Sequence, residues 1–470
     1  MDPVDSVGSL LERAGVITSD RFRQTLELAW PRVVTGFAIM SKQTVDLAMV
    51  GIAVGTAGTA GLAFALGYWG VVALLGLGIA GGTVSLVSQN YGADRPERAS
   101  RVVEQSVLLT AALAVPIMAA FVAVPGVLVG LLGADPASLE QGSTYLVFVA
   151  PAVLFEMLNL IASRTYTGIG DTFTEMVNRA TGALLNVVLS AVLIFGFGLG
   201  VAGAAIGTTV STGVVTLTLG WGMTGRSYGG LLGMEPSPVP IGTGGARVDR
   251  ALLRQLLEIS LPEVGRRLAQ GLIVFPLLWI AASFGPVVVT AFEVARRVRT
   301  VVNSFNWGLS LASSSLVGQH LGEHDETEAG AYGASIVRLG LVVYLCAAGA
   351  VVLLAEPLAG LFVAEEAVAQ TAVFVTVSAI SSVGQGIDGT ATGALIGAGD
   401  TRLPFAASLL GRYVFALPVA ALGLVTPLGI AGLYAALLLE MYVPACINYG
   451  LFRTGRWKAV SRRYRASSEA

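Results

Sequence analysis

Long uninterrupted apolar runs are the feature of this 470-residue sequence that most limits its possible folds. Residues 107–124 and 184–197 are two such runs, and short stretches rich in Gly, Pro, Asp or Arg separate them from their neighbours. With their margins, runs of this length cross the hydrocarbon of a bilayer as helices, at about 1.5 Å per residue. Transmembrane strands would need only about ten residues each. The sequence therefore predicts an all-α polytopic membrane protein.

The composition supports this fold class and weakens the case for an enzyme. Hydrophobic residues make up 54% of the chain and charged residues 12%, too little polar surface for a water-facing globule of this size. Cys346 and Cys446 lie inside apolar runs, and the only histidines, His320 and His324, share one acidic loop. These few cysteine and histidine residues do not form the pattern of a hydrolase or metal site, and the sequence contains no nucleotide-binding motif. We therefore expect no enzyme, no cofactor and no nucleic-acid partner.

Breaks at Gly, Pro and charge clusters predict twelve membrane-spanning helices. Their expected ranges are 24–50, 60–90, 101–125, 141–167, 173–197, 201–223, 251–282, 287–319, 330–354, 368–396, 402–424 and 428–452. Alternate loops lack Lys and Arg, whereas the loop with Arg95, Arg98 and Arg101 is basic. By the positive-inside rule, both termini are then cytoplasmic in a multi-pass protein of the cell membrane. Gly76 to Gly81 matches a dinucleotide-binding pattern by letter, but its place inside a span predicts a close-packing surface for another helix.

An internal repeat divides the chain into two related halves. Trp30-Pro31 recurs as Leu261-Pro262, Gln89-Asn90-Tyr91-Gly92 as Gln319-His320-Leu321-Gly322, and Gly168-Ile169-Gly170-Asp171-Thr172 as Gly397-Ala398-Gly399-Asp400-Thr401, with shifts of 231, 230 and 229. Each half holds an even number of helices, so the repeat is parallel. The predicted organisation is a cytoplasmic extension (1–23), an N-lobe (24–223), a cytoplasmic linker (224–250), a C-lobe (251–452) and a basic cytoplasmic tail (453–470).

These motifs resemble those of the multidrug and toxic compound extrusion (MATE) family over nearly the whole chain. The resemblance is carried by Leu28-Ala29-Trp30-Pro31, Val45-Asp46, Gln89-Asn90-Tyr91-Gly92-Ala93, Gly170-Asp171-Thr172, Gly318-Gln319-His320-Leu321-Gly322 and Gly397-Ala398-Gly399-Asp400-Thr401-Arg402. It implies a secondary active transporter that exports organic, cationic or amphipathic compounds by alternating access, in antiport with H⁺ or Na⁺. The repeat alone supports only a two-lobed transporter, and a lipid-linked oligosaccharide flippase of related architecture is the alternative. The expected partners are small organic substrates and membrane lipids, and the expected state is a monomer.

Charged side chains inside the predicted spans are the best candidates for a site, because each costs about 2.5–3.5 kcal/mol at mid-bilayer. Lys42 and Asp46 lie four residues apart on one helical face, so they can pair. The resemblance implies that Asp46 binds the coupling cation with Asn186, position 190 and Thr208. Many prokaryotic members have Asp where this chain has Ser190, and the loss of that charge, with the nearby ammonium of Lys42, favours protons over a Na⁺ site at Asp46. The alternative is a neutralised pair that only eases insertion.

Two acid and amide pairs are candidates for the substrate cleft. Glu156 is the candidate to replace the missing carboxylate of the cation site, and Asn159 follows on the same helical face. The repeat places Gln385 and Asp388 at the equivalent positions, so acid and amide are exchanged between the halves. We expect both pairs to line a central cleft, with Asp388 contacting cationic substrate. The alternative is a polar patch that hydrogen-bonds between helices.

The eighth predicted span carries an unusual number of charges. Glu293 lies within helical pairing distance of Arg296 and Arg297, so an intrahelical ion pair is expected. The alternative is a cavity-facing surface, with Glu293 and Arg297 in the substrate cleft, that attracts an anionic or zwitterionic substrate. Glu440 stands alone in the last span, and no role for it can be predicted.

Overall fold

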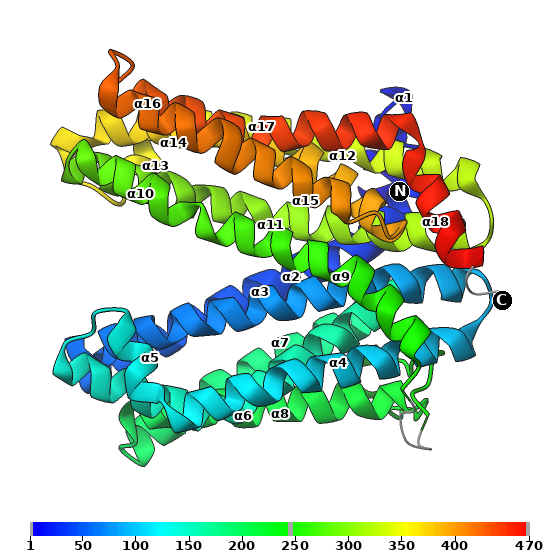
Figure 1. Ribbon diagram of the computed structural model, residues 1–470, viewed down its shortest axis with the longest axis horizontal. Coiled ribbons are helices and arrows are strands. Elements are labelled where there is room, and N and C mark those ends of the chain that lie inside the picture. The colour runs from blue at the N-terminus through cyan, green and yellow to red at the C-terminus, as the bar shows by residue number, and fades with distance from the viewer. Residues whose placement is uncertain (1–2, 243–247, 467–470) are drawn as a thin grey trace. The chain divides into compact units, whose positions relative to one another are not determined.

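A computed structural model describes residues 3–242 and 248–466, and the regular elements in this part of the chain are all helical (Figure 1). Residues 243–247 of the predicted linker and 467–470 of the predicted tail lie outside the described residues. The helices form two compact units. One comprises Val34–Val264, and the other comprises the chain up to Val33 together with Gly265 onward. We call them the first unit and the second unit.

The chain passes through the first unit from the middle of α2. The elements up to α9 are α2 (Ser19–Val54), α3 (Thr56–Gly92), α4 (Pro96–Ala123), α5 (Pro125–Leu131), α6 (Pro136–Gly168), α7 (Thr172–Ala191), a π-helical turn (Val192–Gly196), α8 (Gly200–Met223), a 3₁₀ turn (Leu231–Gly233) and α9 (Arg250–Leu272). In this unit α6 packs against α3, α4 and α8, and we call it the central helix of the unit.

The second unit repeats this arrangement. Its remaining elements are α1 (Pro3–Arg13), α10 (Val274–Ser283), α11 (Pro286–Gly322), α12 (Glu326–Leu353), α13 (Ala355–Gly360), α14 (Glu365–Gly397), α15 (Arg402–Leu409), a π-helical segment (Leu410–Ala416), α16 (Leu417–Val425), α17 (Ala431–Thr454) and α18 (Arg456–Ala466). Here α14 packs against α11, α12 and α17. The central helix and its three neighbours therefore correspond between the units, as the parallel repeat predicts.

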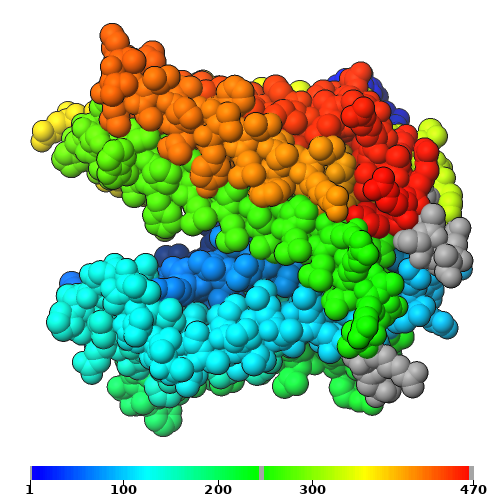
Figure 2. Space-filling model, viewed as in Figure 1, coloured from blue at the N-terminus to red at the C-terminus, as the bar shows by residue number. Residues whose placement is uncertain are grey.

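The membrane spans agree with the prediction. Among the described residues, eleven helical segments are long and apolar enough to cross a bilayer. The remaining predicted span is α11, which has the same 37-residue length as α3 but carries the charges at positions 293, 296, 297 and 299. Figure 2 shows the surface of α4 to α6 in cyan, and the exposed side chains of α4 and α5 include Val115, Val122 and Val127. Such apolar exposure suits lipid.

The repeated Gly-Asp-Thr motifs form the same turn in both units. Gly170 and Gly399 have φ angles of 91° and 83°, a left-handed conformation that glycine adopts without steric cost. The amide of Asp171 donates to the carbonyl of Tyr166, and the amide of Asp400 donates to that of Leu395, both at 2.9 Å. Identical hydrogen bonds at positions 229 residues apart show that the repeat is structural.

The compact units differ from the predicted lobes, 24–223 and 251–452, at two places. The start of α2 belongs to the second unit, and α9 as far as Val264 belongs to the first. Close packing explains why the start of α9 belongs to the first unit. An added Cβ on Gly78 of α3 would lie within 2.3 Å of Val264 of α9, and one on Gly82 would lie equally close to Ser260. The glycine-rich stretch of α3 is thus the predicted close-packing surface, and α9 is its partner.

The N-terminal segment is not a free extension. Ile17 and Phe22 are buried in a cluster that includes Leu309 of α11 and Ile336 of α12. Arg21 also forms an ion pair with Glu328 of α12, with 2.8 Å between Nη2 and Oε1. The segment predicted as a cytoplasmic extension is therefore an integral part of the second unit.

Candidate functional site

A buried polar cluster joins three helices of the first unit. Asp46 of α2 is only 6% exposed, and Asn186 of α7 and Thr208 of α8 are almost fully buried. With its nitrogen toward Asp46, the orientation that satisfies both of its polar atoms, the Asn186 amide donates to the two carboxylate oxygens at 3.0 and 3.2 Å. Its oxygen then accepts from the hydroxyl and the amide of Thr208, both at 3.1 Å. The structure thus brings together three of the residues proposed for cation coupling.

Ser190 and Lys42 flank this cluster in different ways. The Ser190 hydroxyl is buried near the Asp46 carboxylate but makes no hydrogen bond of normal geometry to any described residue. Lys42 lies one turn before Asp46 on α2 and is close enough to interact electrostatically with it. In the described part of the chain, however, no ion pair joins the two side chains within 4 Å. Lys42 and Asp46 therefore interact electrostatically at longer range, without the expected direct ion pair.

The described residues of the second unit include no polar counterpart of this cluster. The repeat aligns Asp46 with Leu277 and Thr208 with Leu437. These leucines are 2% and 0% exposed and belong to one hydrophobic core cluster with Ile273, the equivalent of Lys42. Among the described residues, the Asp46 cluster is thus confined to the first unit.

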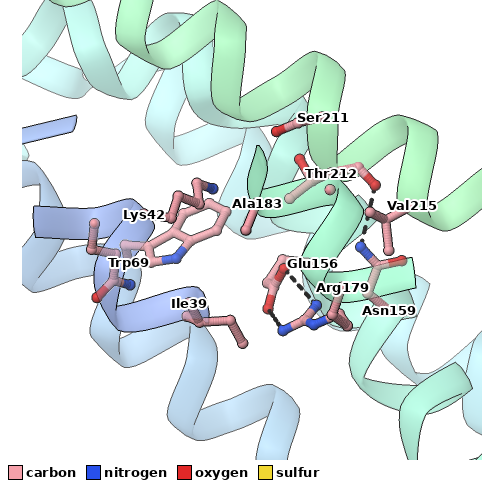
Figure 3. A pocket seen from close by; sticks show the side chains of 12 residues that line it. Ile39, Lys42, Trp69, Glu156, Asn159, Arg179, Ala183, Ser211, Thr212 and Val215 are labelled. Carbon is pink, nitrogen blue, oxygen red and sulfur yellow. Dashed lines mark hydrogen bonds and ion pairs between the residues drawn. The ribbon is translucent and has the colours of Figure 1, made fainter. Parts of the chain in front are cut away.

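A pocket in the first unit adjoins Lys42 (Figure 3). It has about 460 Å³ of space, part of it open to the outside. Glu156 of α6 and Arg179 of α7 line it and form a bidentate ion pair, with 2.8 Å between Oε1 and Nη2 and 3.1 Å between Oε2 and Nη1. Glu156, proposed as a carboxylate of the cation site, is thus bound to Arg179 and is absent from the hydrogen bonds of the Asp46 cluster.

The rest of the pocket is partly apolar and partly polar. Ile39 and Trp69 contribute apolar surface near Lys42 (Figure 3). Asn159 of α6 donates from Nδ2 to the carbonyl of Thr212 at 3.2 Å. Its Oδ1 is buried and accepts no hydrogen bond from the described residues. The pocket therefore offers a bound molecule an ammonium and an aromatic face.

The other predicted cleft residues lie in the second unit and are bound by their own neighbours. Gln385 donates to Oδ1 of Asn303 at 2.7 Å. Asp388 is 8% exposed and accepts from Nδ2 of Asn448 at 2.7 Å and from the hydroxyl of Thr392 at 3.4 Å. This local network matches the expected interhelical hydrogen bonding, and substrate contact at Asp388 stays a prediction.

Three of the four charged side chains at positions 293, 296, 297 and 299 of α11 form ion pairs. Glu293 and Arg296 form the expected intrahelical ion pair, with 3.2 Å between Oε1 and Nη1, and Arg297 is exposed. Glu440 of α17, for which no role was predicted, lies between Arg299 at 3.4 Å and Arg412 at 3.6 Å. Arg412 is 3% exposed and belongs to the π-helical segment Leu410–Ala416.

Sequence reasoning missed Arg179 and Arg412. Arg179 is the arginine of the predicted span 173–197, and Arg412 lies in the middle of the predicted span 402–424. A charge at such a position was the available signal. Their acidic partners lie on other helices, so helical spacing along one span could not reveal the pairs.

The comparison with known families decides the identity of this fold. The MatE family model matches residues 31–192 and 264–422, which together make up most of the chain. The chain belongs to the MatE family. This is the MATE transporter family whose motifs the sequence resembles, so the protein is a membrane transporter rather than an enzyme.

Relatives and solved structures agree with this assignment. The chain is 27% identical to a probable multidrug resistance protein NorM of Rhodopseudomonas palustris, over 90% of each sequence. It is also 27% identical to the protein of that name in Deinococcus radiodurans, over 96% of this chain and 98% of the relative. A mutant of the Vibrio cholerae MATE transporter VcmN superposes with a TM-score of 0.85 at 21% identity, covering 94% of this chain and 99% of the other. At that identity the structural likeness shows the fold alone.

Proposed function

We propose that this protein is a cation-coupled antiporter that exports amphipathic organic compounds, with Asp46 as the coupling carboxylate. The observation that carries this proposal is the buried cluster of Asp46, Asn186 and Thr208 inside a membrane-spanning bundle. A carboxylate in such a place is costly unless it has a function. The names of the NorM relatives supply the expectation of multidrug export.

Protons are the coupling ion that best suits this cluster. The Asn186 amide directs its nitrogen at Asp46, so it offers N–H donors and no oxygen ligand to a metal cation there. Ser190 contributes no charge, and the ammonium of Lys42 repels a second cation. Protonation of Asp46 removes a negative charge without requiring ligands, so H⁺ can bind where Na⁺ is disfavoured.

The orientation of the transporter follows from its basic loops. The positive-inside rule places both termini in the cytoplasm of a cell-membrane protein. Family membership favours this antiporter over the related lipid-linked flippase. The resemblance predicts that the exported organic compounds are cationic or amphipathic.

Reconstitution tests the proposal directly. Purified protein in liposomes should drive efflux of a fluorescent organic compound under an imposed pH gradient and not under a Na⁺ gradient. Asp46→Asn should abolish this coupled efflux, whereas Glu366→Gln, which removes an exposed carboxylate at the start of α14, should leave it unchanged. Full transport by Asp46→Asn under the pH gradient would rule out Asp46 as the coupling group.

A further inference from the structure

The last helix of the second unit, α18, follows directly on a membrane span. The span α17 ends at Thr454, and α18 begins at Arg456 after a single residue, Gly455. Gly455 has a φ angle of 69°, and Figure 1 shows the sharp turn between the two helices. The 11 residues of α18 extend over about 16 Å. All of α18 therefore lies close to the surface of the membrane that α17 spans.

One face of α18 is fixed against the second unit. Trp457 is 1% exposed and packs in a cluster with Leu321 of α11 and Ala329 of α12. Its Nε1 donates to the carbonyl of Phe452 at 2.9 Å, and Ser461, one turn later, is also buried. Residues four apart lie on one helical face. The opposite face of α18 therefore points away from the bundle.

This opposite face carries cations without acidic partners. Arg456 and Arg463 are exposed, lie two helical turns apart, and form no ion pair in the described part of the chain. Arg462 differs, because it forms a bidentate ion pair with Glu326 of α12, with 2.6 Å between Nε and Oε1 and 2.7 Å between Nη2 and Oε2. That pair fastens α18 to α12 and leaves Arg456 and Arg463 able to bind another anion.

The sequence around α18 makes this end of the chain strongly positive. Residues 453–465 include no acidic residue and six basic ones, namely Arg453, Arg456, Lys458, Arg462, Arg463 and Arg465. Clusters of about four to eight Lys or Arg directly after a span attract anionic lipids. Headgroups surround the end of the span, so they meet this surface without recruitment, whereas a soluble acidic protein would have to be recruited. Anionic lipid is therefore the partner that best complements α18.

We propose that the exposed face of α18 binds the headgroups of anionic phospholipids, with Arg456 and Arg463 as the phosphate-binding residues. A guanidinium suits this role because it donates two parallel hydrogen bonds to a phosphate. Arg462 instead positions the helix through its ion pair with Glu326. The surface belongs to the second unit and shares no residue with the Asp46 cluster, so this inference is independent of the proposed antiport.

Native mass spectrometry of the full-length protein in a neutral detergent tests the proposal. The probes are phosphatidylglycerol, which is anionic, and phosphatidylcholine with the same acyl chains, which has no net charge. Each basic residue near an anionic surface contributes about a factor of five in affinity, so the first phosphatidylglycerol should bind about 30-fold more tightly than phosphatidylcholine. Equal affinity for the two lipids would overturn the proposal and leave a soluble acidic partner as the occupant.

The dependence of binding on salt checks that the preference is electrostatic. Raising the ammonium acetate concentration from about 0.1 M to about 1 M shortens the Debye length from about 10 Å to about 3 Å. The preference for phosphatidylglycerol should then disappear. A preference that persists at about 1 M salt would show that the lipid is recognised through its apolar part, and would contradict the proposed role of the two arginines.

Paired substitutions assign the preference to α18. Arg456→Gln/Arg463→Gln should lose about 30-fold in affinity for phosphatidylglycerol and keep the melting temperature, because both side chains are exposed. Arg456→Lys/Arg463→Lys should keep most of the preference because it keeps both charges. The matched control Arg13→Gln/Arg254→Gln removes two exposed charges elsewhere and should bind like wild type. An equal loss in the control, or no loss in the first variant, would overturn the assignment.

Two further measurements separate lipid from free phosphate and binding from positioning. Millimolar inorganic phosphate should not displace phosphatidylglycerol, and displacement would show that the surface binds any phosphate anion. Arg462→Gln should change the affinity far less than the double variant, because that guanidinium is already bound to Glu326. A loss as large as that of Arg456→Gln/Arg463→Gln would assign lipid binding to Arg462 and contradict its positioning role.

Discussion

Removing either Glu156 or Arg179 alone should destabilise the first unit, because the charge of the other partner would stay buried without its ion pair. Glu156→Gln keeps the shape of the side chain and removes its charge. Arg179 would then remain 7% exposed without its bidentate partner, and Lys42 would add a second cation to the same pocket. The perturbation therefore leaves two positive charges, those of Arg179 and Lys42, lining the pocket without the carboxylate that accompanies them in the native protein.

The magnitude follows from the burial and geometry of the pair. Two unit charges about 4 Å apart attract by about 4 kcal/mol at an effective dielectric constant of 20. Removing one partner of a buried pair costs about 3–5 kcal/mol, mostly because the other charge stays buried. We expect Glu156→Gln to lower the free energy of unfolding by about 3–5 kcal/mol. Arg179→Gln should cost less, since Lys42 remains near the Glu156 carboxylate.

A double-mutant cycle measures this coupling. Reversible unfolding in mixed micelles, followed by tryptophan fluorescence, gives the free energy of unfolding for wild type, Glu156→Gln, Arg179→Gln and the double variant. The double variant should cost clearly less than the sum of the single variants, with an interaction energy of at least about 2 kcal/mol. Single-variant costs below about 1 kcal/mol, typical of solvent-exposed pairs, would show that water screens the pair and would refute the reasoning.

Two further predictions concern helix packing and capping. An added Cβ on Gly78 would lie 2.3 Å from Cγ2 and 2.6 Å from Cα of Val264. Gly78→Ala should therefore lower the free energy of unfolding by about 1–3 kcal/mol. The control Gly67→Ala, whose added Cβ has nothing within 4 Å, should not destabilise the protein. Asp171 accepts from the amide of Thr174 at 2.9 Å as the cap of α7, so Asp171→Ala should cost about 1 kcal/mol and Asp171→Asn much less. Burial raises the pKa of Asp171, so the folded state holds the proton of this carboxyl group more tightly than the unfolded state does. The free energy of unfolding of the wild type should therefore fall as the pH rises from about 4 through that raised pKa. The melting temperature of Asp171→Asn should lack this dependence on pH.

Hydropathy predicts where helices cross the membrane but not which bundle each half of a helix joins. The spans and the repeated turns at Gly170 and Gly399 were predictable, because apolar runs and left-handed glycines are local properties of the chain. The exchange of the starts of α2 and α9 between the units was not. Only the glycine-rich stretch of α3 signalled close packing, and a row of small residues does not name the helix that covers it.

The candidate site was predictable to a different extent. Asp46, Asn186 and Thr208 were placed together by their resemblance to a known motif, and the structure brings them into contact. Arg179 and Arg412 were missed, because their carboxylate partners lie 23 and 28 residues away on other helices. Pairing rules along one helix extend only three or four residues, so charge balance between helices needs coordinates.

The two units keep one scaffold but place their buried charges in opposite ways. In the first unit Asp46 occupies the position where the second unit has Leu277 in a dry core. In the second unit Arg299 occupies the position that Trp69 has in the first, and Glu440 occupies the position of Ser211. Arg299 and Arg412 both form ion pairs with Glu440. The Glu440 carboxylate is thus held by two arginines on other helical segments, which gives it a structural role in the second unit. Asp46 instead has an amide neighbour, Asn186, and one nearby lysine, Lys42. This contrast supports the proposal that Asp46 of the first unit is the coupling carboxylate, whereas Glu440 is a structural charge of the second unit.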